Sequence, residues 1–191
     1  MRSRMTATRC AWANGNPLMA AYHDREWGVP VHRDRKLFEF LALETVQAGL
    51  SWQIILNKRE NFRNALHGFD PEKIARYSAR DMKRLLNDPG IIRNRLKIEA
   101  TINNARRFLE AREAFGTFDR YIWQFVGGRT LRHRFRSMSQ VPATSKESDA
   151  MSKDMKKRGF QFVGSTTSYA FMQAVGMVND HVVTCFRYNQ V

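Results

Sequence analysis

Apolar residues return at helical spacing through long stretches of this chain, whereas the alternation typical of β-strands is scarce. The longest stretch runs from Asn94 to Ala114 and is rich in arginine. It predicts an amphipathic helix whose apolar side carries Leu96, Ile98, Ile102, Ala105 and Leu109. The same spacing predicts a helix over Arg35–Ala48. Helices of this kind bury their apolar faces against other helices, so we expect an all-α fold.

Capping residues indicate where three further helices begin. Pro71 suits a first helical position, because the N–H that proline lacks would have no partner there. Ser78 and, three residues later, Asp81 form an approximate capping box. Ser148 is the expected N-cap of a helix that ends at Gly159 after two basic residues.

The secondary structure of the last third of the chain is less clear from the sequence. Residues 127–147 are basic and rich in turn-forming residues, so we expect them to be the least structured part. Helices over residues 169–178 and 179–186 would complete the all-α fold. The segment from 156 to 181 reveals no chemistry of its own.

Charge and length narrow the class of protein. The chain has 191 residues, and its 32 Lys and Arg against 18 Asp and Glu leave a net charge of +14. Such a positive field favours nucleic acid as a partner. No apolar run is long enough to cross a bilayer, so no membrane partner is expected. Residues 1–8 are basic but lack an apolar stretch, which predicts a disordered arm or tag remnant rather than a secretory signal.

Two cysteines and two histidines lie near the two ends of the chain. His181 and Cys185 are four residues apart, which would place both on one helical face, and Cys10 and His23 lie near the other end. Together they would complete a tetrahedral, and therefore structural, Zn²⁺ site. Alternatively, the cysteines are small core residues, since Cys10 and His23 match no standard finger spacing. Two cysteines exclude a disulfide framework.

Glu44 falls on the apolar face of the helix expected over Arg35–Ala48, where an unpaired carboxylate is costly. It is therefore either a functional group or a boundary residue paired with an arginine. Tyr22, Trp27 and Trp52 also lie in the first part of the chain. Aromatic residues at such spacing are usually core, but beside a buried acid they would suit a pocket for a flat, electron-poor base.

The segment Leu85–Ile98 predicts two helices joined by a tight turn at Gly90. Unpaired N–H groups at the start of the second helix would bind a DNA phosphate of any sequence, with added charge from Arg93, Arg95 and Lys97. Ordinary helix corners contain similar turns, so the pattern alone leaves both interpretations open.

Eight segments occur in order between about Arg9 and Cys185: CAW, AYHDREWGVP, FEFLALE, QAGLSW, KREN, GIIRNRLKI, KKRGFQFVG and YAFMQAVGMVNDHVVTC. Together they resemble the bacterial 3-methyladenine DNA glycosylase I family. The resemblance implies an all-α, helix-hairpin-helix DNA glycosylase fold, with a structural zinc site that joins the N- and C-terminal segments. Residues 9–191 would form one catalytic unit of two lobes, with the helix-hairpin-helix at about 78–114 and the zinc-bound lobe built from both termini.

The resemblance also implies roles for individual residues. Around the base it places Glu44, as the recognising and catalytic acid, with Tyr22, Trp52 and Trp27. The DNA contacts would come from Leu50, which fills the gap left by a flipped base, and from the hairpin residues Gly90, Ile91, Arg93 and Arg95. One zinc ion per chain would be held by Cys10, His23, His181 and Cys185. No catalytic aspartate is assigned.

The implied activity is base-excision repair by a monofunctional glycosylase, which flips 3-methyladenine out of alkylated double-stranded DNA and releases it hydrolytically, leaving an abasic site. An ionised Glu44 would attract the cationic base, and free 3-methyladenine would be the product. We expect a monomer in the bacterial cytoplasm, associated with the nucleoid. The alternatives are a non-catalytic helix-hairpin-helix DNA-binding protein and a zinc hydrolase, which would need an open metal position.

The chain departs from the family's pattern close to the expected pocket. Met19 stands where the family often has a tyrosine, and Thr45 and Val46 differ from the Gly-Gln that can follow the acid. These departures affect the expected shape of the pocket rather than the expected reaction.

Overall fold

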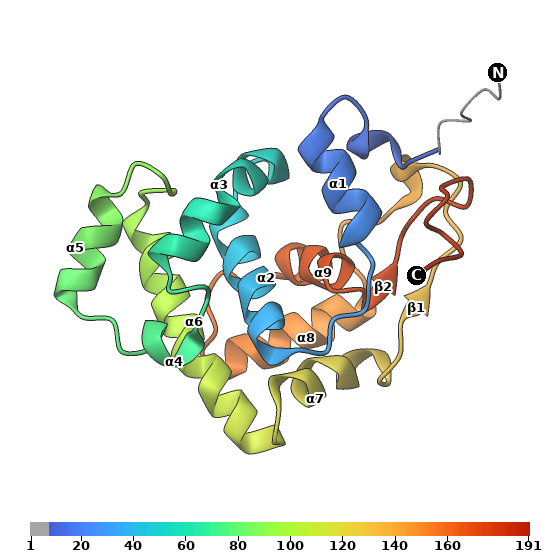
Figure 1. Cartoon of the computed structure of the whole chain (residues 1–191). Coiled ribbons are helices and arrows are strands. Elements are labelled where there is room, and N and C mark those ends of the chain that lie inside the picture. Colours follow the sequence, from blue (N-terminus) through green and yellow to red (C-terminus); the bar gives the residue numbers. More distant parts are fainter. Residues whose placement is uncertain (1–7) are drawn as a thin grey trace.

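The computed structural model describes residues 8–191, so the arm expected over residues 1–8 lies almost wholly outside the described residues. The described part is mostly helical, as predicted (Figure 1). Its α-helices are α1 (Pro17–Arg25), α2 (Asp34–Gln47), α3 (Trp52–Ala65), α4 (Pro71–Ile74), α5 (Ala79–Asn87), α6 (Arg95–Phe115), α7 (Phe118–Trp123), α8 (Lys146–Lys157) and α9 (Ser165–Ala174). Short 3-10 helices cover η1 (Ala11–Ala13), η2 (Gln124–Val126) and η3 (Met138–Gln140).

Helix α2 forms the centre of the molecule and confirms the helix predicted over Arg35–Ala48. Every residue from Leu37 to Val46 is buried, because α3, α6, α7 and α9 all pack against it (Figure 1). Two of these buried residues, Glu39 and Glu44, are acidic. The middle of the core therefore contains two carboxyl groups, and burying each of them is costly unless it is paired or has a functional role.

Helix α6 confirms the amphipathic helix predicted from Asn94, whose side chain caps it by accepting a hydrogen bond from the N–H of Lys97. Ile98, Ile102 and Ala105 are buried as expected. Leu96 is not: it is 64% exposed, so placing it on the buried face was wrong. It lies in the first turn of α6, next to the exposed residues Arg93, Asn94 and Arg95.

The predicted capping residues are partly confirmed. The N–H of Ser78 donates to Asp81 over 2.9 Å at the start of α5. Helix α4 begins at Pro71 but ends after one turn. Helix α8 begins earlier than predicted, because Ser145 is its N-cap and Ser148, the expected cap, is the reciprocal partner in the first turn. Their side chains accept from each other's N–H groups over 2.8 and 3.2 Å.

The C-terminal part differs most from expectation. Residues 179–186 form no helix; instead β2 (Val178–Asn179) pairs in parallel with β1 (Leu131–Arg132). Residues 127–147 were expected to be the least structured, yet the N–H groups of Leu131 and His133 donate to the carbonyls of Met177 and Asn179 over 2.9 and 3.2 Å. The helix predicted over residues 179–186 is wrong, whereas residues 127–147 do contain only short elements before α8 begins. A two-residue strand leaves no periodic signal in the sequence.

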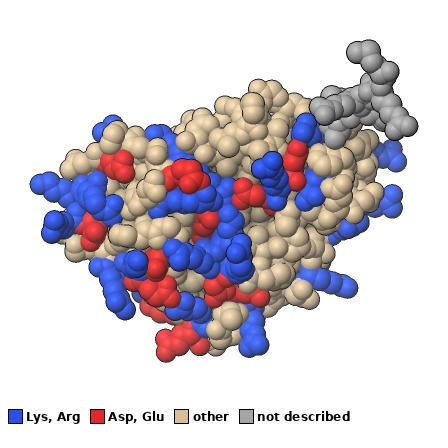
Figure 2. All heavy atoms as spheres, in the orientation of Figure 1, with Lys and Arg blue, Asp and Glu red and all other residues tan. Residues whose placement is uncertain are grey.

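Basic side chains are spread over the surface and gather at the end of the molecule formed by α5 (Figure 2). Acidic side chains lie mostly along the middle of the face shown, close to basic ones (Figure 2). Among the described residues, no helix is both long and apolar enough to span a membrane.

Candidate active site and metal centre

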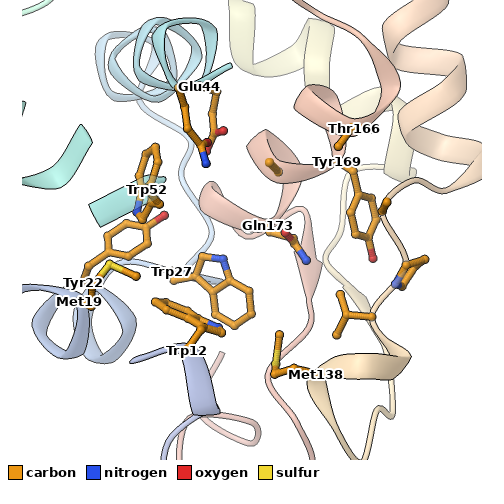
Figure 3. Close-up of a pocket in the computed structure, with 15 residues that line it drawn as sticks. Trp12, Met19, Tyr22, Trp27, Glu44, Trp52, Met138, Thr166, Tyr169 and Gln173 are labelled. Carbon is orange, nitrogen blue, oxygen red and sulfur yellow. The ribbon is translucent and has the colours of Figure 1, made fainter. Parts of the chain in front are cut away.

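A cavity of about 420 Å³ lies between α1, α2 and the start of α3 on one side and α9 with the η3 segment on the other (Figure 3). All four residues expected to surround the base line it: Tyr22, Trp27, Glu44 and Trp52. These side chains come from three helices and the loop after α1, and the fold brings them together as the sequence predicted. The cavity has the size and largely apolar lining of a small-molecule site.

Glu44 is only 4% exposed, yet its side chain faces the cavity (Figure 3). Within the described residues its carboxyl group has no ion-pair or hydrogen-bond partner, so the alternative of a boundary glutamate paired with an arginine is wrong. Burial raises the pKa of Glu44 to about 8. In the free protein the carboxyl group is therefore mostly protonated at neutral pH, whereas the sequence analysis expected it to be ionised.

Aromatic rings form the wall beside Glu44. The rings of Tyr22 and Trp52 lie 5.3 Å apart, and those of Trp12 and Trp27 lie 5.1 Å apart and nearly perpendicular. Burial raises the pKa of Tyr22, so its hydroxyl group stays a hydrogen-bond donor. The Nε1–H of Trp52 is buried without a partner among the described residues. An unpaired buried donor costs about 1–3 kcal/mol, which a ligand would recover.

The opposite wall was missed by the sequence analysis, which found no chemistry in residues 156–181. Helix α9 contributes Thr166, Tyr169 and Gln173 to the cavity (Figure 3). Asp180, buried behind them, accepts from the Tyr169 hydroxyl and from the Gln173 amide, both over 2.7 Å. These polar residues on an otherwise buried helix were the available signal. The rest of this wall comes from residues 138–143, in the segment expected to be the least structured part of the chain.

The departures from the family's pattern have different consequences. Met19 lines the cavity, so it does change the wall. Thr45 and Val46 are buried on the other side of α2, where the Thr45 hydroxyl donates to the Leu41 carbonyl over 2.8 Å. These two residues therefore leave the shape of the cavity alone.

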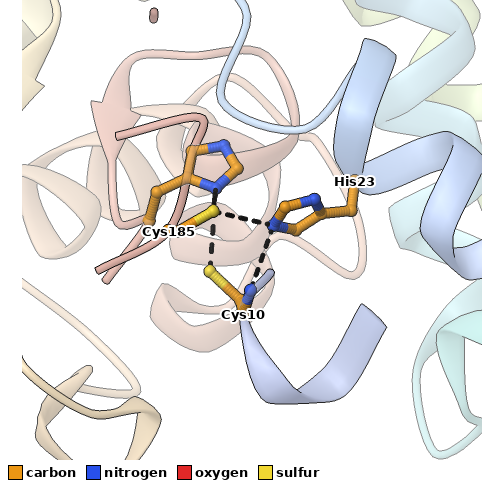
Figure 4. A group of neighbouring side chains, drawn as sticks. Cys10, His23 and Cys185 are labelled. Atoms are coloured by element: carbon orange, nitrogen blue, oxygen red, sulfur yellow. Dashed lines mark hydrogen bonds between the residues drawn. The ribbon is translucent and has the colours of Figure 1, made fainter. Parts of the chain in front are cut away.

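The second site is the cluster predicted from both ends of the chain: Cys10, His23, His181 and Cys185 are all buried, and their ligand atoms lie within 4.8 Å of one another. The Cys185 Sγ atom lies 3.4 Å from His23 Nε2 and 3.5 Å from His181 Nδ1. Figure 4 shows Cys10, His23 and Cys185 converging. The segment that contains His181 and Cys185 forms turns and no helix. The two side chains were correctly predicted to lie close together, but the predicted helix is wrong.

The cluster has the chemistry of a metal site. The outer nitrogen of each ring is occupied: His23 Nδ1 lies 2.8 Å from Asp24 Oδ1, and His181 Nε2 lies 3.1 Å from the Trp27 carbonyl. These contacts leave one nitrogen of each ring directed at the two sulfur atoms. Zn–N and Zn–S bonds of about 2.0–2.3 Å place tetrahedral ligand atoms about 3.3–3.8 Å apart. The sulfur–nitrogen separations of 3.4, 3.5 and 3.6 Å fall in this range, and all four ligand atoms lie within 4.8 Å of one another.

The turn between α5 and α6 differs in detail from expectation. The N–H of Gly90 donates to Asp88 Oδ1 over 2.7 Å, so it is not free for a phosphate. Ile91 is buried and fixes the turn. Among the described residues, the N–H groups of Ile92 and Arg93 have no partner, and the exposed Arg93 side chain has none either. Arg95 pairs weakly with Glu99, at 3.6 Å.

Leu50 lies half-buried in the turn between α2 and α3, beside Gly49, whose φ of +76° favours glycine. The buried Lys97 of α6 donates to the carbonyls of Val46 and Ala48 over 2.8 and 2.6 Å. The start of α6 is therefore bonded directly to the turn that carries Leu50.

The helical architecture recurs in known proteins. A solved crystal structure of 3-methyladenine DNA glycosylase I is 49% identical with a TM-score of 0.91, covering 94% of this chain and 98% of that one. Another, of a variant of such an enzyme in complex with 3-methyladenine, is 35% identical with a TM-score of 0.90, covering 93% and 96%. The fold is thus that of a DNA glycosylase.

The sequence comparisons agree with the fold. DNA-3-methyladenine glycosylase 1 of Escherichia coli is 49% identical over 180 residues, which cover 94% of this chain and 96% of the relative. The family model described as methyladenine glycosylase matches residues 12–188. The chain belongs to the methyladenine glycosylase family.

Proposed function

We propose that the protein hydrolyses the N-glycosidic bond of 3-methyladenine in alkylated double-stranded DNA, releases the free base and leaves an abasic site. The observation that carries this proposal is the unpaired carboxyl group of Glu44 in an aromatic cavity of about 420 Å³. A flipped base fits such a cavity, and a non-catalytic DNA-binding protein would need neither the cavity nor the acid.

The cavity suits a methylated, cationic base better than a normal one. Stacking and cation–π attraction by Tyr22, Trp52 and Trp27 would contribute about 1–2 kcal/mol each. Binding of the cation would ionise Glu44, which then accepts hydrogen bonds from the exocyclic amine and offsets the positive charge. Because the charged base is already a good leaving group, Glu44 needs to hold it and stabilise charge rather than supply a strong acid.

The DNA would be held by two adjoining turns. The segment 78–114 would act as a helix-hairpin-helix, with the free N–H groups of Ile92 and Arg93 and the Arg93 side chain on a phosphate. Gly90 and Ile91 would shape this turn, and Arg95 would add charge. Leu50 would enter the stack in place of the flipped base. Lys97 fixes the two turns relative to each other, so the phosphate contact and the apolar wedge act at a set distance.

The Cys/His cluster would hold one structural Zn²⁺ per chain, with Cys10, His23, His181 and Cys185 as its four ligands. Four protein ligands leave no position for water, which argues against a zinc hydrolase. The ion would hold the N- and C-terminal segments together and so complete one lobe of a single unit over residues 9–191. We further propose a monomer that works in the bacterial cytoplasm, where it meets the DNA of the nucleoid.

The test is release of free base from methylated duplex DNA, followed by chromatography under single-turnover conditions. Glu44→Gln keeps the shape of the side chain but gives up its charge, so base affinity should fall by about 1.5–3 kcal/mol and excision about 10- to 100-fold. Glu60→Gln, a change at an exposed glutamate, is the matched control and should behave like the wild type. A wild-type protein that releases no base would overturn the proposed function.

The phosphate contact has its own test. Arg93→Ala should weaken binding of damaged and undamaged duplexes by the same factor, and the salt dependence should become shallower by about 0.9 in log–log slope. A loss confined to the damaged duplex would show that Arg93 acts in lesion recognition instead.

A further inference from the structure

Residues 131–136 form an extended segment with one side against the protein and one side in solvent. Leu131, His133 and Phe135 are half-buried, whereas Arg132, Arg134 and Arg136 are exposed, so we call these three arginines the arginine strip. Such alternation is typical of extended backbone, in which successive side chains point to opposite sides.

The segment is fixed along its length by backbone hydrogen bonds. The N–H groups of Leu131 and His133 donate to Met177 and Asn179, and the Phe135 carbonyl accepts from the N–H of Val183 over 2.8 Å. A strip held in this way presents its arginines at a fixed spacing of about 6.6 Å.

The charges of the strip are not neutralised by the protein. Among the described residues, the side chains of Arg134 and Arg136 have no ion-pair or hydrogen-bond partner. Arg132 is partly engaged, since it donates to the Val191 carbonyl over 2.8 Å and lies over the ring of Tyr188. The acid behind the strip, Asp180, is buried and bonded to His133 at 2.6 Å.

The strip leads directly to the cavity. Residues 138–143 follow it in sequence and form part of the cavity wall contributed by the α9 side. In Figure 1 β1 lies at the right edge of the molecule and the α5–α6 turn at the left, with the elements of the cavity between them. Basic side chains project along that right edge in Figure 2.

We propose that the arginine strip binds the phosphate backbone of DNA on the side of the cavity away from the α5–α6 turn. This inference rests on the proposed function, because it assigns the second side of the same DNA. The strip spans about 13 Å, a length over which one strand of B-DNA carries about four phosphates. With contacts on both sides of the cavity, the duplex is held on either side of the flipped base.

The experiment measures binding of an undamaged duplex between 50 and 200 mM salt for the wild type and for Arg134→Ala/Arg136→Ala. Two lost phosphate contacts should lower the log–log salt slope by about 1.8, so the affinity advantage of the wild type should shrink about 12-fold over this range. Arg134→Lys/Arg136→Lys should restore the slope, because lysine also binds phosphate as a point charge.

The matched control is Lys153→Ala/Lys156→Ala, which removes the same charge from the exposed side of α8, a helix that lines no part of the cavity. Its salt slope should equal that of the wild type. Equal slopes for the strip variant and the α8 variant would overturn the proposal. Base release at low salt and affinity for free 3-methyladenine report on the proposed function separately, since neither needs the strip.

Discussion

Helix α1 separates two polar regions that have opposite characters, and adjacent residues of α1 belong to each. His23 faces the Cys/His cluster, where both rings use both nitrogens within the protein. Tyr22 faces the cavity, where its hydroxyl group, the Glu44 carboxyl and Trp52 Nε1 have no partner among the described residues. In the cluster the ring nitrogens contact other protein groups, whereas the polar groups of the cavity have no protein partner and are available to a ligand.

Helix α2 shows the same contrast between two acids five residues apart. Burial would raise the pKa of Glu39, but Arg59 and Lys36 bring it below its usual value. Glu44 has no such neighbours, and burial raises its pKa to about 8. Both carboxyl groups are buried, so the difference between a structural and a functional acid lies in the partners and not in the burial.

The largest loss of stability is expected from a substitution in the Cys/His cluster. Cys185→Ser should abolish the proposed zinc binding and destabilise the protein by more than about 4 kcal/mol, because metal-binding free energy is part of folding free energy. Metal analysis and thermal unfolding would measure this. The change removes no group from the cavity. A metal-free Cys10/Cys185 double variant that stays tightly folded would show that the two regions do not differ as described.

Removing the most buried partner of the structural acid should have the next largest effect. Arg59 bonds Glu39 over 2.7 Å and Glu26 over two contacts of 2.8 Å, so Arg59→Met takes the buried cation from two carboxylates and leaves Glu39 with the more exposed Lys36 and Arg63. We expect a loss of about 3–5 kcal/mol in the free energy of unfolding, measured by chemical denaturation, with unchanged base affinity. An equal loss in base affinity would place Arg59 in the functional region.

Replacing the functional acid, Glu44, should make the folded protein more stable at neutral and higher pH rather than less stable. The folded pKa of Glu44, about 8, lies above the ordinary value of 4.5, so the folded state binds more protons between these values and stability falls as pH rises through them. Glu44→Gln removes this effect. Relative to the wild type it should gain about 2–4 kcal/mol of stability between pH 4 and pH 8. A stability difference that does not change with pH would mean that Glu44 is solvated or paired.

The smallest effect is expected for a single unpaired hydroxyl. Tyr22→Phe should leave the stability of the free protein nearly unchanged, because the hydroxyl group has no protein partner to lose. Affinity for free 3-methyladenine, measured by calorimetry, should fall by about 0.5–1.5 kcal/mol. If stability falls instead and affinity does not, the Tyr22 hydroxyl belongs to the structural region.

The sequence predicted those parts of the fold that leave a periodic or a chemical signal. Helices α2 and α6 appeared within about one residue of their observed bounds, because their apolar residues repeat over several turns. The Cys/His cluster and the grouping of Glu44 with three aromatic residues were also anticipated, although the roles implied by resemblance went further than spacing alone.

The rest depended on contacts between distant segments. The sheet formed by the two-residue strands β1 and β2 arises only because residues 47 positions apart pair with each other. The cavity wall formed by residues 138–143 likewise depends on distant segments such as α9, and no local pattern encodes either contact. Gly90 is a second example. Its N–H group was expected to bind a phosphate, but it donates a hydrogen bond to the side chain of Asp88 instead.

The Cys/His cluster also sets an order of events during synthesis. Cys10 and His181 are 171 positions apart, so the ribosome, at about 5–20 residues per second, takes about 10–35 seconds to make the second after the first. During that time Cys10 and His23 have been synthesised but His181 and Cys185 have not, so the cluster cannot form. A nascent chain interrupted before residue 185 cannot close the cluster, so the cross-link between residue 10 and residue 185 can form only after Cys185 has been made.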